Sequence, residues 1–391
     1  MRVVMKQMKL KDISVVVLFL GILYAGLALN LIKPADELSF SERRRLAQFP
    51  DINVRAVLNA ESMDGFDDFA VDQFVFREQF RRLKARFDLN VWLKADNNAI
   101  FVVGDQVFKT DYPLRENSVT RLSELTNYIY AQYLYGMDVF YAIVPEKNYY
   151  LDDHRHLIID YRFLADLARA GTNGEIGEID LFGVLSLDSY YMTDTHWRQE
   201  KLADVVDTIS QAFGSGLRFE AGGYTQMSYS PFHGVYFGQS ALSVKPDEMI
   251  YLVSDVTENA VVTSIERPGT TLAVYDTGQL GGMDSYNLFM HGPQAVIRAE
   301  NPLNPGAKEL IIFRDSFASS LAPLLLPGYS AVKLVDLRYI RPELVGDYID
   351  FTDQDVLFLY SSGIVNNSDS MRSPPQDAFV SPFHARLGIR D

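Results

Sequence analysis

Short, continuous apolar runs that alternate with helical segments constrain the fold of this chain more than any other feature. The apolar runs occupy residues 137–145 (MDVFYAIVP), 309–313 (ELIIF), 331–337 (AVKLVDL) and 355–360 (DVLFLY). Apolar residues at helical spacing predict helices over 119–135, 157–170 and 200–213, and over FASSLAPLLL and RPELVGDYI between the later runs. Strands that are apolar on both faces and alternate with helices are typical of a parallel sheet covered on both sides. The sequence therefore predicts an α/β fold with a parallel sheet flanked by helices.

The middle of the chain has a different composition. Residues 217–290 are richer in Gly, Ser, Thr and Tyr and include β-branched runs such as AVVTSI. This pattern predicts a mostly β insertion in the α/β domain. With 391 residues, the chain can form one large domain or two of medium size.

The N-terminal region contains an uncharged apolar segment. Residues 13–32 carry no charge, which is about one bilayer crossing at ~1.5 Å per residue. Four basic residues precede the segment, whereas Lys33 is followed by Asp36 and Glu37. The positive-inside rule then predicts a single-pass anchor in the cell membrane, with residues 1–12 cytoplasmic and the remainder outside the cytoplasm. A cleaved signal peptide is the alternative, although no A-x-A site follows the run; a buried core helix fits less well because the run has no polar face.

The segment that follows the apolar run is predicted to be a linker over residues 33–51. Its basic cluster, SERRR at 41–45, either contacts anionic headgroups or is solvated. The extracytoplasmic domain would then span residues 52–391 and begin with an amphipathic stretch. Large apolar residues recur there at roughly helical spacing: Phe66, Phe69, Phe74, Phe76, Phe80, Leu83 and Phe87. We interpret these side chains as core contacts.

The overall composition excludes several classes of function. A net charge of −15 and a pI near 4.9 argue against a nucleic-acid partner. The chain has no cysteine, which excludes disulfides, cysteine nucleophiles and thiolate metal sites. No convincing P-loop or dinucleotide-type glycine pattern occurs, so we expect no nucleotide cofactor.

A carboxylate, an imidazole and an indole lie together in TDTHWRQE, residues 193–200. In an extended segment, Asp194 and His196 leave the backbone on the same face, and a small turn could bring the carboxylate to the ring. They could form two thirds of a catalytic triad whose nucleophile lies elsewhere. The alternative is a hydrogen-bonded turn in which the Trp197 indole is packed.

The stretch KELIIFRDSFASSLAPLL offers the missing nucleophile. Ser316 lies where a buried strand meets a helix that begins near Phe317, and helix amides there could stabilise an oxyanion. His196 would take the Ser316 proton while Asp194 fixes the imidazole tautomer. The alternative is an ordinary N-cap, because Asp-Ser before a helix is a common capping sequence.

Several ordered blocks of the chain resemble the DHHW-type proteins and the periplasmic alginate O-acetyltransferases, which are SGNH-hydrolase-like. YYMTDTHWRQE is similar to their signature, FSERRRLAQFP to their opening and DQFVFREQFRRLKA to the next block. YAIVPEKNYY is similar to a strand that ends in a Pro-x-Lys-type turn. HGPQAVIRAENPLNPGAKELIIFRDSFASSLAPLL, followed by AVKLVDLRY, resembles the block that carries the serine.

This resemblance implies an SGNH-hydrolase-like (flavodoxin-like) fold with Ser316 as the nucleophile and Asp194 and His196 as the acid–base pair. The pair precedes the serine in the chain, the reverse of ordinary SGNH hydrolases. The implied reaction is acetyl transfer to an extracellular or cell-wall polysaccharide. A multi-spanning membrane protein that supplies acetyl groups is the implied partner.

The chain departs from the family pattern at several positions. Thr195 replaces the first of the two histidines of the DHHW name, as in the alginate enzymes, and Arg314-Asp315 precedes the serine instead of Gly-Asp. Where relatives tend to have His-Gly-Asn, this chain has Pro293, which lacks an N–H donor. The Ser316 amide is therefore the main expected oxyanion donor, with Gly292 and Asn301 as further candidates. We assign Trp197 to packing that supports the loop.

Two further groups of residues have a functional and a structural interpretation. LDDHRH places Asp152, Asp153, His154 and His156 together, which suits a metal, but a solvated polar turn is commoner and we expect no metal. The tyrosines Tyr149, Tyr150, Tyr190 and Tyr191 could form a sugar-stacking wall, and Tyr190, Tyr191 and Arg314 are candidate substrate-binding residues. Core or rim packing is the alternative for the tyrosines.

The predicted function is that of a membrane-anchored, extracytoplasmic O-acetyltransferase that works through an acetyl-serine intermediate. A carbohydrate esterase with the same triad is one alternative. A non-catalytic glycan-binding or assembly protein with the same fold is the other.

Overall fold

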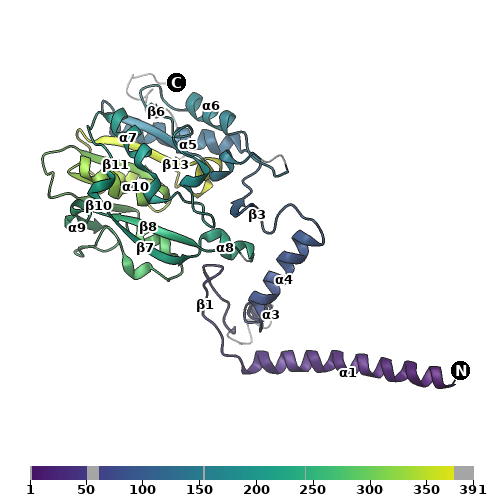
Figure 1. Cartoon of the computed structure of the whole chain (residues 1–391). Helices are drawn as coiled ribbons and strands as arrows, with labels where there is room; N and C mark the ends of the chain where they lie inside the picture. Colours follow the sequence, from purple (N-terminus) through teal and green to yellow (C-terminus); the bar gives the residue numbers. More distant parts are fainter. Residues whose placement is uncertain (1, 51–60, 153–154, 243, 374–391) are drawn as a thin grey trace. The chain divides into compact units, whose positions relative to one another are not determined.

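The computed structural model describes residues 2–50, 61–152, 155–242 and 244–373. The chain forms two compact units, one of residues 1–94 with 241–243 and one of residues 95–240 with 244–391. The larger unit contains the central sheet, and the smaller unit contains the long N-terminal helix (Figure 1).

The larger unit is built on a seven-stranded sheet with the order β6-β5-β13-β11-β12-β10-β9. The strands are β5 (Val139–Val144), β6 (Gly177–Ile179), β9 (Val261–Ser264), β10 (Val296–Glu300), β11 (Glu309–Arg314), β12 (Ala331–Val335) and β13 (Asp355–Ser361). The five strands from β6 to β12 are parallel, while β10 runs antiparallel to β12 and to β9. The predicted parallel α/β sheet is confirmed, and it gains β10 and β9 at one edge and β6 at the other.

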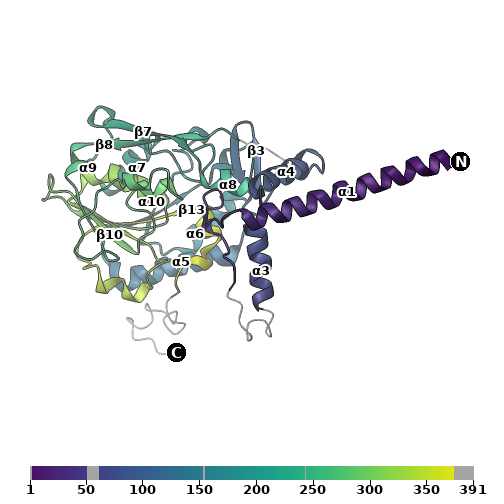
Figure 2. The same ribbon diagram turned by 90° about the horizontal axis from the view of Figure 1, so that it is seen from below.

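Helices cover both faces of the sheet. They are α5 (Glu116–Ile129), α6 (Tyr161–Gly171), α7 (Ala203–Phe213) and α10 (Phe317–Leu325). Ile311 and Phe313 pack in the core that includes α5 and α6, whereas Leu310 and Ile312 pack in the core that includes α7 and α10. In Figure 2 the two helix pairs lie on opposite sides of the sheet. The alternation explains why the central strands contain nearly continuous apolar runs.

The order of the strands in the sheet places the two halves of the predicted site at one edge. Counted from β11, the five parallel strands follow the flavodoxin-like order 2-1-3-4-5, with β5 and β6 in the last two places. Along the chain, the first strand of this sheet is therefore β5, which takes the fourth place in that order. As a result, the loop after β6 comes before β11 in the sequence, although the carboxyl ends of both strands lie at the same edge.

The segment 217–290 contains the predicted β structure in two parts. Strands β7 (Thr225–Phe232) and β8 (Asp247–Val253) form a separate antiparallel pair, whereas β9 joins the central sheet. The short helices α8 (Val235–Ser240) and α9 (Asp255–Asn259) lie between these strands in the sequence. A further hairpin, β3 (Ile100–Val103) and β4 (Gln106–Lys109), precedes α5, and helix α11 (Ser362–Asn366) follows β13.

The predicted helices differ from the observed ones mainly at their ends. The helix predicted over 119–135 is α5 followed by a π-helical turn at Tyr130–Leu134. Helix α6 begins at Tyr161 because the Asp160 carboxylate caps it, accepting a hydrogen bond from the Phe163 N–H at 3.0 Å. The segment RPELVGDYI forms a short 3₁₀ helix, Pro342–Asp347.

The smaller unit begins with helix α1 (Arg2–Ile32) and continues with β1 (Leu38–Ser39), β2 (Arg44–Arg45), α3 (Glu61–Asp72) and α4 (Arg77–Asn90). Within α1, the segment Lys11–Ile32 is long and apolar enough to cross a membrane, with a mean hydropathy of 2.5. None of this segment is buried in the structure, so the interpretation as a core helix does not hold.

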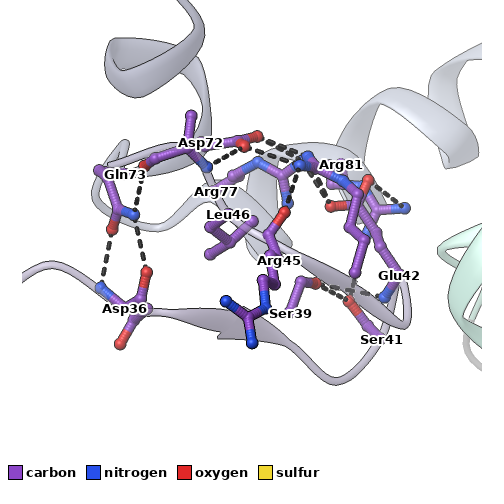
Figure 3. A network of polar contacts seen from close by, with 12 residues as sticks. Asp36, Ser39, Ser41, Glu42, Arg45, Leu46, Asp72, Gln73, Arg77 and Arg81 are labelled. Atoms are coloured by element: carbon purple, nitrogen blue, oxygen red, sulfur yellow. Dashed lines mark hydrogen bonds and ion pairs between the residues drawn. The ribbon is translucent and has the colours of Figure 1, made fainter. Parts of the chain in front are cut away.

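The interpretation of the phenylalanines in residues 63–93 as core contacts is wrong for most of them. Phe66 and Phe69 contact Phe49, but the large apolar residues Phe80, Leu83 and Phe87 of α4 are exposed. Polar groups hold this unit together instead (Figure 3). The spacing correctly predicted helices, but it did not show which helical face would be covered.

Candidate active site

Ser316 lies in a sharp turn between β11 and α10. The Asp315 carboxylate fixes this turn, because it accepts hydrogen bonds from the Phe317 N–H at 3.0 Å and the Ser361 N–H at 2.7 Å. The second bond ties the turn to the end of β13. Ser316 occupies the N-cap position of α10, but its side chain makes no capping hydrogen bond there. The hydroxyl instead contacts a side chain from the loop that follows β6.

His196 connects Ser316 to Asp194. Its Nε2 is 2.7 Å from the Ser316 Oγ, and its Nδ1 is 2.6 Å from Oδ1 of Asp194. Asp194 is fully buried and His196 almost so. With Nδ1 protonated, Nε2 can accept the serine proton, which is the tautomer that general-base chemistry requires. The structure therefore brings together the three residues predicted as a triad.

Two buried carboxylates hold the backbone of this loop. Asp194 Oδ1 also accepts the His196 N–H at 3.0 Å, and its Oδ2 accepts the Val235 N–H at 2.7 Å. Asp247 accepts the backbone N–H groups of Met192 at 2.7 Å and Thr193 at 2.8 Å. Each carboxylate thus fixes backbone amides of the site loop or of the segment that packs on it, and only Asp194 also contacts the imidazole.

Lys147 also supports the loop that carries Asp194 and His196. Its buried ammonium donates to the carbonyl oxygens of Tyr191 at 3.0 Å and Met192 at 2.9 Å. Burial lowers the pKa of Lys147 to about 7. Gly234 allows close packing on the other side, since a Cβ there would lie 2.3 Å from the Thr193 carbonyl oxygen.

Trp197 and Tyr286 orient the imidazole. The Trp197 indole N–H lies within hydrogen-bond distance of the Phe317 carbonyl at 3.0 Å and Ser320 Oγ at 2.9 Å, which joins the histidine loop to the serine helix. The Tyr286 ring stacks on His196 at a centroid distance of 3.8 Å. The placement of Trp197 agrees with the packing role expected from the sequence.

A pocket of about 500 Å³ opens beside Ser316 at the edge of the sheet where β5, β11 and β13 end. This is the edge at which open α/β sheets usually bind their ligands. Polar side chains form much of its wall: Lys109, Asp111, Tyr112, Arg115, Gln239 and Asn367. The lining therefore offers many hydrogen-bond donors and acceptors.

Glu146 is a pocket residue that the sequence analysis missed. Its carboxylate accepts a hydrogen bond from Thr195 Oγ1 at 2.9 Å, next to the His196 backbone. Burial, and to a smaller extent the nearby carboxylates of Asp111 and Asp315, raise the pKa of Glu146 to about 7. The signal was present in YAIVPEKNYY, because Glu146 follows a parallel strand whose carboxyl end faces the site.

The candidate oxyanion donors Gly292 and Asn301 do not line this pocket. The Asn301 amide is buried and donates to the carbonyl oxygens of Leu326 and Tyr329. The Gly292 carbonyl accepts a hydrogen bond from Arg314 at 3.0 Å. These contacts occupy both residues in structural roles away from the serine hydroxyl.

The candidate substrate-binding residues Arg314, Tyr190 and Tyr191 are fully buried and outside the pocket lining, so a substrate-binding role does not fit. Arg314 donates to Ser319 Oγ at 2.8 Å, and burial lowers its pKa below the usual value. The Tyr190 hydroxyl donates to the Pro145 carbonyl at 2.5 Å. All three brace the strand ends that form the site.

The cluster considered as a metal site is only partly covered by the structure. Asp153 and His154 lie outside the described residues. His156 stacks on Phe101 at a centroid distance of 3.8 Å. Among residues 2–50, 61–152, 155–242 and 244–373, no group of three or more potential metal ligands occurs.

The sheet order, the turn after β11 and the Ser–His–Asp contacts define an SGNH-hydrolase-like α/β protein. Comparison with solved structures shows which proteins of known structure the chain is similar to. The chain is similar to a DHHW family protein from Eubacterium siraeum, with a TM-score of 0.57, 16% identity, and coverage of 71% of this chain and 98% of that one. It is also similar to Bacillus cereus PatB1, with a TM-score of 0.54, 18% identity, and coverage of 68% and 96%. The likeness to a DHHW-type protein predicted from the sequence is therefore confirmed in the fold.

A weaker match is to the O-acetyltransferase domain of Pseudomonas putida AlgJ, with a TM-score of 0.41, 13% identity, and coverage of 74% of this chain and 98% of that one. No protein-family model and no curated protein sequence matches the chain.

Proposed function

We propose that this protein is a membrane-anchored, extracytoplasmic O-acetyltransferase that transfers an acetyl group to a polysaccharide hydroxyl. The observation that carries the proposal is the continuous relay from Asp194 through His196 to Ser316, with heavy-atom distances of 2.6 and 2.7 Å. Proton transfer by a positioned base requires distances of roughly 2.6–3.2 Å. The relay ends at a pocket wide enough for a substrate group.

The reaction proceeds in two half-reactions. His196 Nε2 takes the Ser316 proton while Oγ attacks the carbonyl carbon of the acetyl donor. The protonated imidazole, stabilised by Asp194, returns the proton to the leaving group, and an acetyl-serine forms. His196 then takes the proton of the acceptor hydroxyl, whose oxygen attacks the acetyl carbonyl; the bond to Ser316 Oγ breaks, and the imidazolium returns the proton to Oγ as the acetyl ester is released. The Ser316 backbone amide at the start of α10 stabilises the oxyanion in both steps.

The character of the pocket supports a carbohydrate acceptor. Sugar hydroxyls need neighbouring donors and acceptors, and the wall provides both kinds, from Lys109 and Arg115 to Asp111 and Asn367. The resemblance of the sequence blocks to the alginate O-acetyltransferases points in the same direction.

The apolar segment Lys11–Ile32 supports the proposed location. The basic residues before it place the N-terminus in the cytoplasm by the positive-inside rule, so that the larger unit lies outside. Polysaccharides of the cell envelope are accessible there, but cytoplasmic acetyl donors are not. A multi-spanning membrane protein that passes acetyl groups across the bilayer would fill this gap as a partner.

Acylation of the full chain in detergent tests the proposal. The protein is incubated with an activated acetyl ester, and peptide mass spectrometry locates any adduct. We expect an adduct on Ser316 in the wild type that S316A and H196A lose. Folded protein that forms no adduct and hydrolyses no ester would favour a non-catalytic glycan-binding role.

A second arm separates the transferase from the esterase. Acetylated protein is chased with oligosaccharides of the cell envelope or with buffer alone, and the released acetyl groups are counted as sugar ester or as acetate. A transferase produces sugar ester at the expense of acetate, whereas an esterase produces acetate in both chases.

A further inference from the structure

Helix α4 has the reverse of the polarity expected for a helix in a water-soluble unit. Phe76, immediately before the helix, and Phe80, Leu83 and Phe87 within it recur at spacings of four, three and four residues, so they form one stripe. We call these four residues the α4 stripe. Their side chains are between 48% and 58% exposed. A surface helix in water normally turns such a stripe toward the core.

Two arginines of α4 that lie outside the stripe point inward. Arg77 and Arg81 are only 14% and 18% exposed, and both pair with Glu42 in the β1–β2 loop. Arg77 also lies 3.5 Å from Asp72 at the end of α3. Figure 3 shows this network around Glu42, Arg77 and Arg81. The ion pairs fix the rotation of the helix, so the apolar stripe cannot turn inward without breaking them.

The start of α4 is tied to the end of the apolar helix. The Val75 N–H donates to Asn30 Oδ1 at 2.7 Å, and Asn30 lies in the last turn of α1. Gln73 is bonded through its side chain to the backbone of Asp36, at 2.8 Å in each direction. If α1 crosses the bilayer, these contacts hold the beginning of α4 at the level of the membrane surface.

Basic residues flank the α4 stripe. Arg82 and Arg86 are exposed on one side, and Lys84, which pairs with Asp88, is exposed on the other. A helix with an apolar stripe bordered by Arg and Lys is typical of segments that lie in the interface of a membrane with anionic lipids. Lys94 lies over the Trp92 ring just beyond the helix, and that ring contacts Phe87 edge-on.

We propose that α4 lies on the lipid surface, with the α4 stripe inserted between headgroups and its basic flanks on anionic phosphates. The proposal rests on the proposed membrane anchor, but not on acetyl transfer. The smaller unit would then hold the segment that follows α1 at the bilayer surface.

The chain contains a built-in probe for this contact. It has two tryptophans, of which Trp92 beside the stripe is 65% exposed and Trp197 is fully buried. The full chain is reconstituted into phosphatidylcholine–phosphatidylglycerol vesicles with or without brominated acyl chains, which quench only indoles that reach the lipid. The signal of W92F provides the Trp197 background. Carbonate extraction of the same vesicles reports separately on the anchor.

We expect Trp92 to be quenched by the brominated lipid and the quenching to be lost in the double variant L83S/F87S. The matched control is L303S in the larger unit, because Leu303 is 56% exposed and Leu83 is 58% exposed. L303S should leave the quenching unchanged. Carbonate-resistant protein with unquenched Trp92 would refute the docking of α4 and leave the anchor standing. Protein that carbonate extracts, with Trp92 unquenched, would refute both, and quenching that persists in L83S/F87S would show that the stripe does not mediate the contact.

Discussion

Replacing Asp194 by asparagine tests the relay most directly, because the site needs acceptors on both oxygens. Oδ1 accepts from the His196 backbone and from Nδ1, while Oδ2 accepts from the Val235 N–H. An amide has one acceptor oxygen and one donor nitrogen. In either orientation of the new side-chain amide, its NH₂ group therefore faces a buried N–H donor, of Val235 or of His196.

The two orientations have different consequences. With the amide nitrogen toward Val235, the imidazole keeps its tautomer, but two donors face each other at a cost of about 1–3 kcal/mol. With the amide nitrogen toward His196, Nδ1 becomes the acceptor and Nε2 carries the proton, so the ring can no longer take a proton from Ser316. The protein also loses the charge that stabilises the imidazolium.

We expect D194N to lower the rate of Ser316 acetylation by about 10⁴-fold, the loss typical of such a tautomer error in a serine triad. That factor corresponds to about 5.5 kcal/mol of transition-state stabilisation. Single-turnover acetylation by an activated ester, followed by mass spectrometry, measures the rate. Chemical denaturation of the same sample measures stability, which we expect to fall by about 1–3 kcal/mol.

Asp247 offers a matched control. It is buried like Asp194 and accepts hydrogen bonds from the same loop, from Met192 and Thr193, but it does not contact the imidazole. D247N should lose comparable stability but keep at least about tenfold more activity than D194N, since the histidine tautomer is unaffected. Folded D194N that acetylates within about tenfold of the wild type would refute the reasoning, as would equal losses of activity in the two variants.

Three further predictions concern neighbouring residues. Glu146 has a folded-state pKa of about 7 against an ordinary 4.5, so the folded chain holds a proton that the unfolded chain releases between these values. The unfolding free energy of the wild type should therefore fall as pH rises from 4.5 to 7. Above pH 7, denaturant titrations should give E146Q an unfolding free energy up to about 3 kcal/mol higher than that of the wild type. A difference between the two proteins that does not depend on pH would contradict this. Lys147 has the opposite effect, because its pKa is lowered from 10.5 to about 7 and the unfolded chain holds the extra proton. The wild-type unfolding free energy should gain about 1.4 kcal/mol per pH unit between these values relative to K147M, and parallel pH profiles would show that burial does not shift this pKa. G234A places a Cβ 2.3 Å from the Thr193 carbonyl oxygen and should cost on the order of 1–3 kcal/mol and most of the acetylation activity. G222A, where a Cβ meets nothing within 4 Å, is its control in thermal unfolding, and equal melting temperatures for the two variants would argue against the close packing.

The amino-acid sequence by itself determined the class of fold and indicated which residues are candidates for the site. Continuous apolar runs such as ELIIF, alternating with helical segments, are typical of strands covered on both faces, which indicates a parallel sheet. The Asp-x-His spacing and the serine at a strand–helix junction carry local chemistry that can be recognised without coordinates. The uncharged segment before residue 33 is equally local, because its length alone matches a bilayer.

The tertiary structure decided how distant groups meet and which faces are covered. His196 and Ser316 are 120 positions apart, and they meet because the sheet places β6 and β11 with their carboxyl ends at one edge. Tyr190 and Asn301 have hydrogen-bonding groups that could serve a site, but packing directs them to buried carbonyls. In α4, periodicity indicated an apolar stripe but not its direction, because ion pairs with Glu42, which is distant in sequence, set the rotation of the helix. Spacing along a chain determines which residues share a face, whereas contacts between distant segments determine what that face meets.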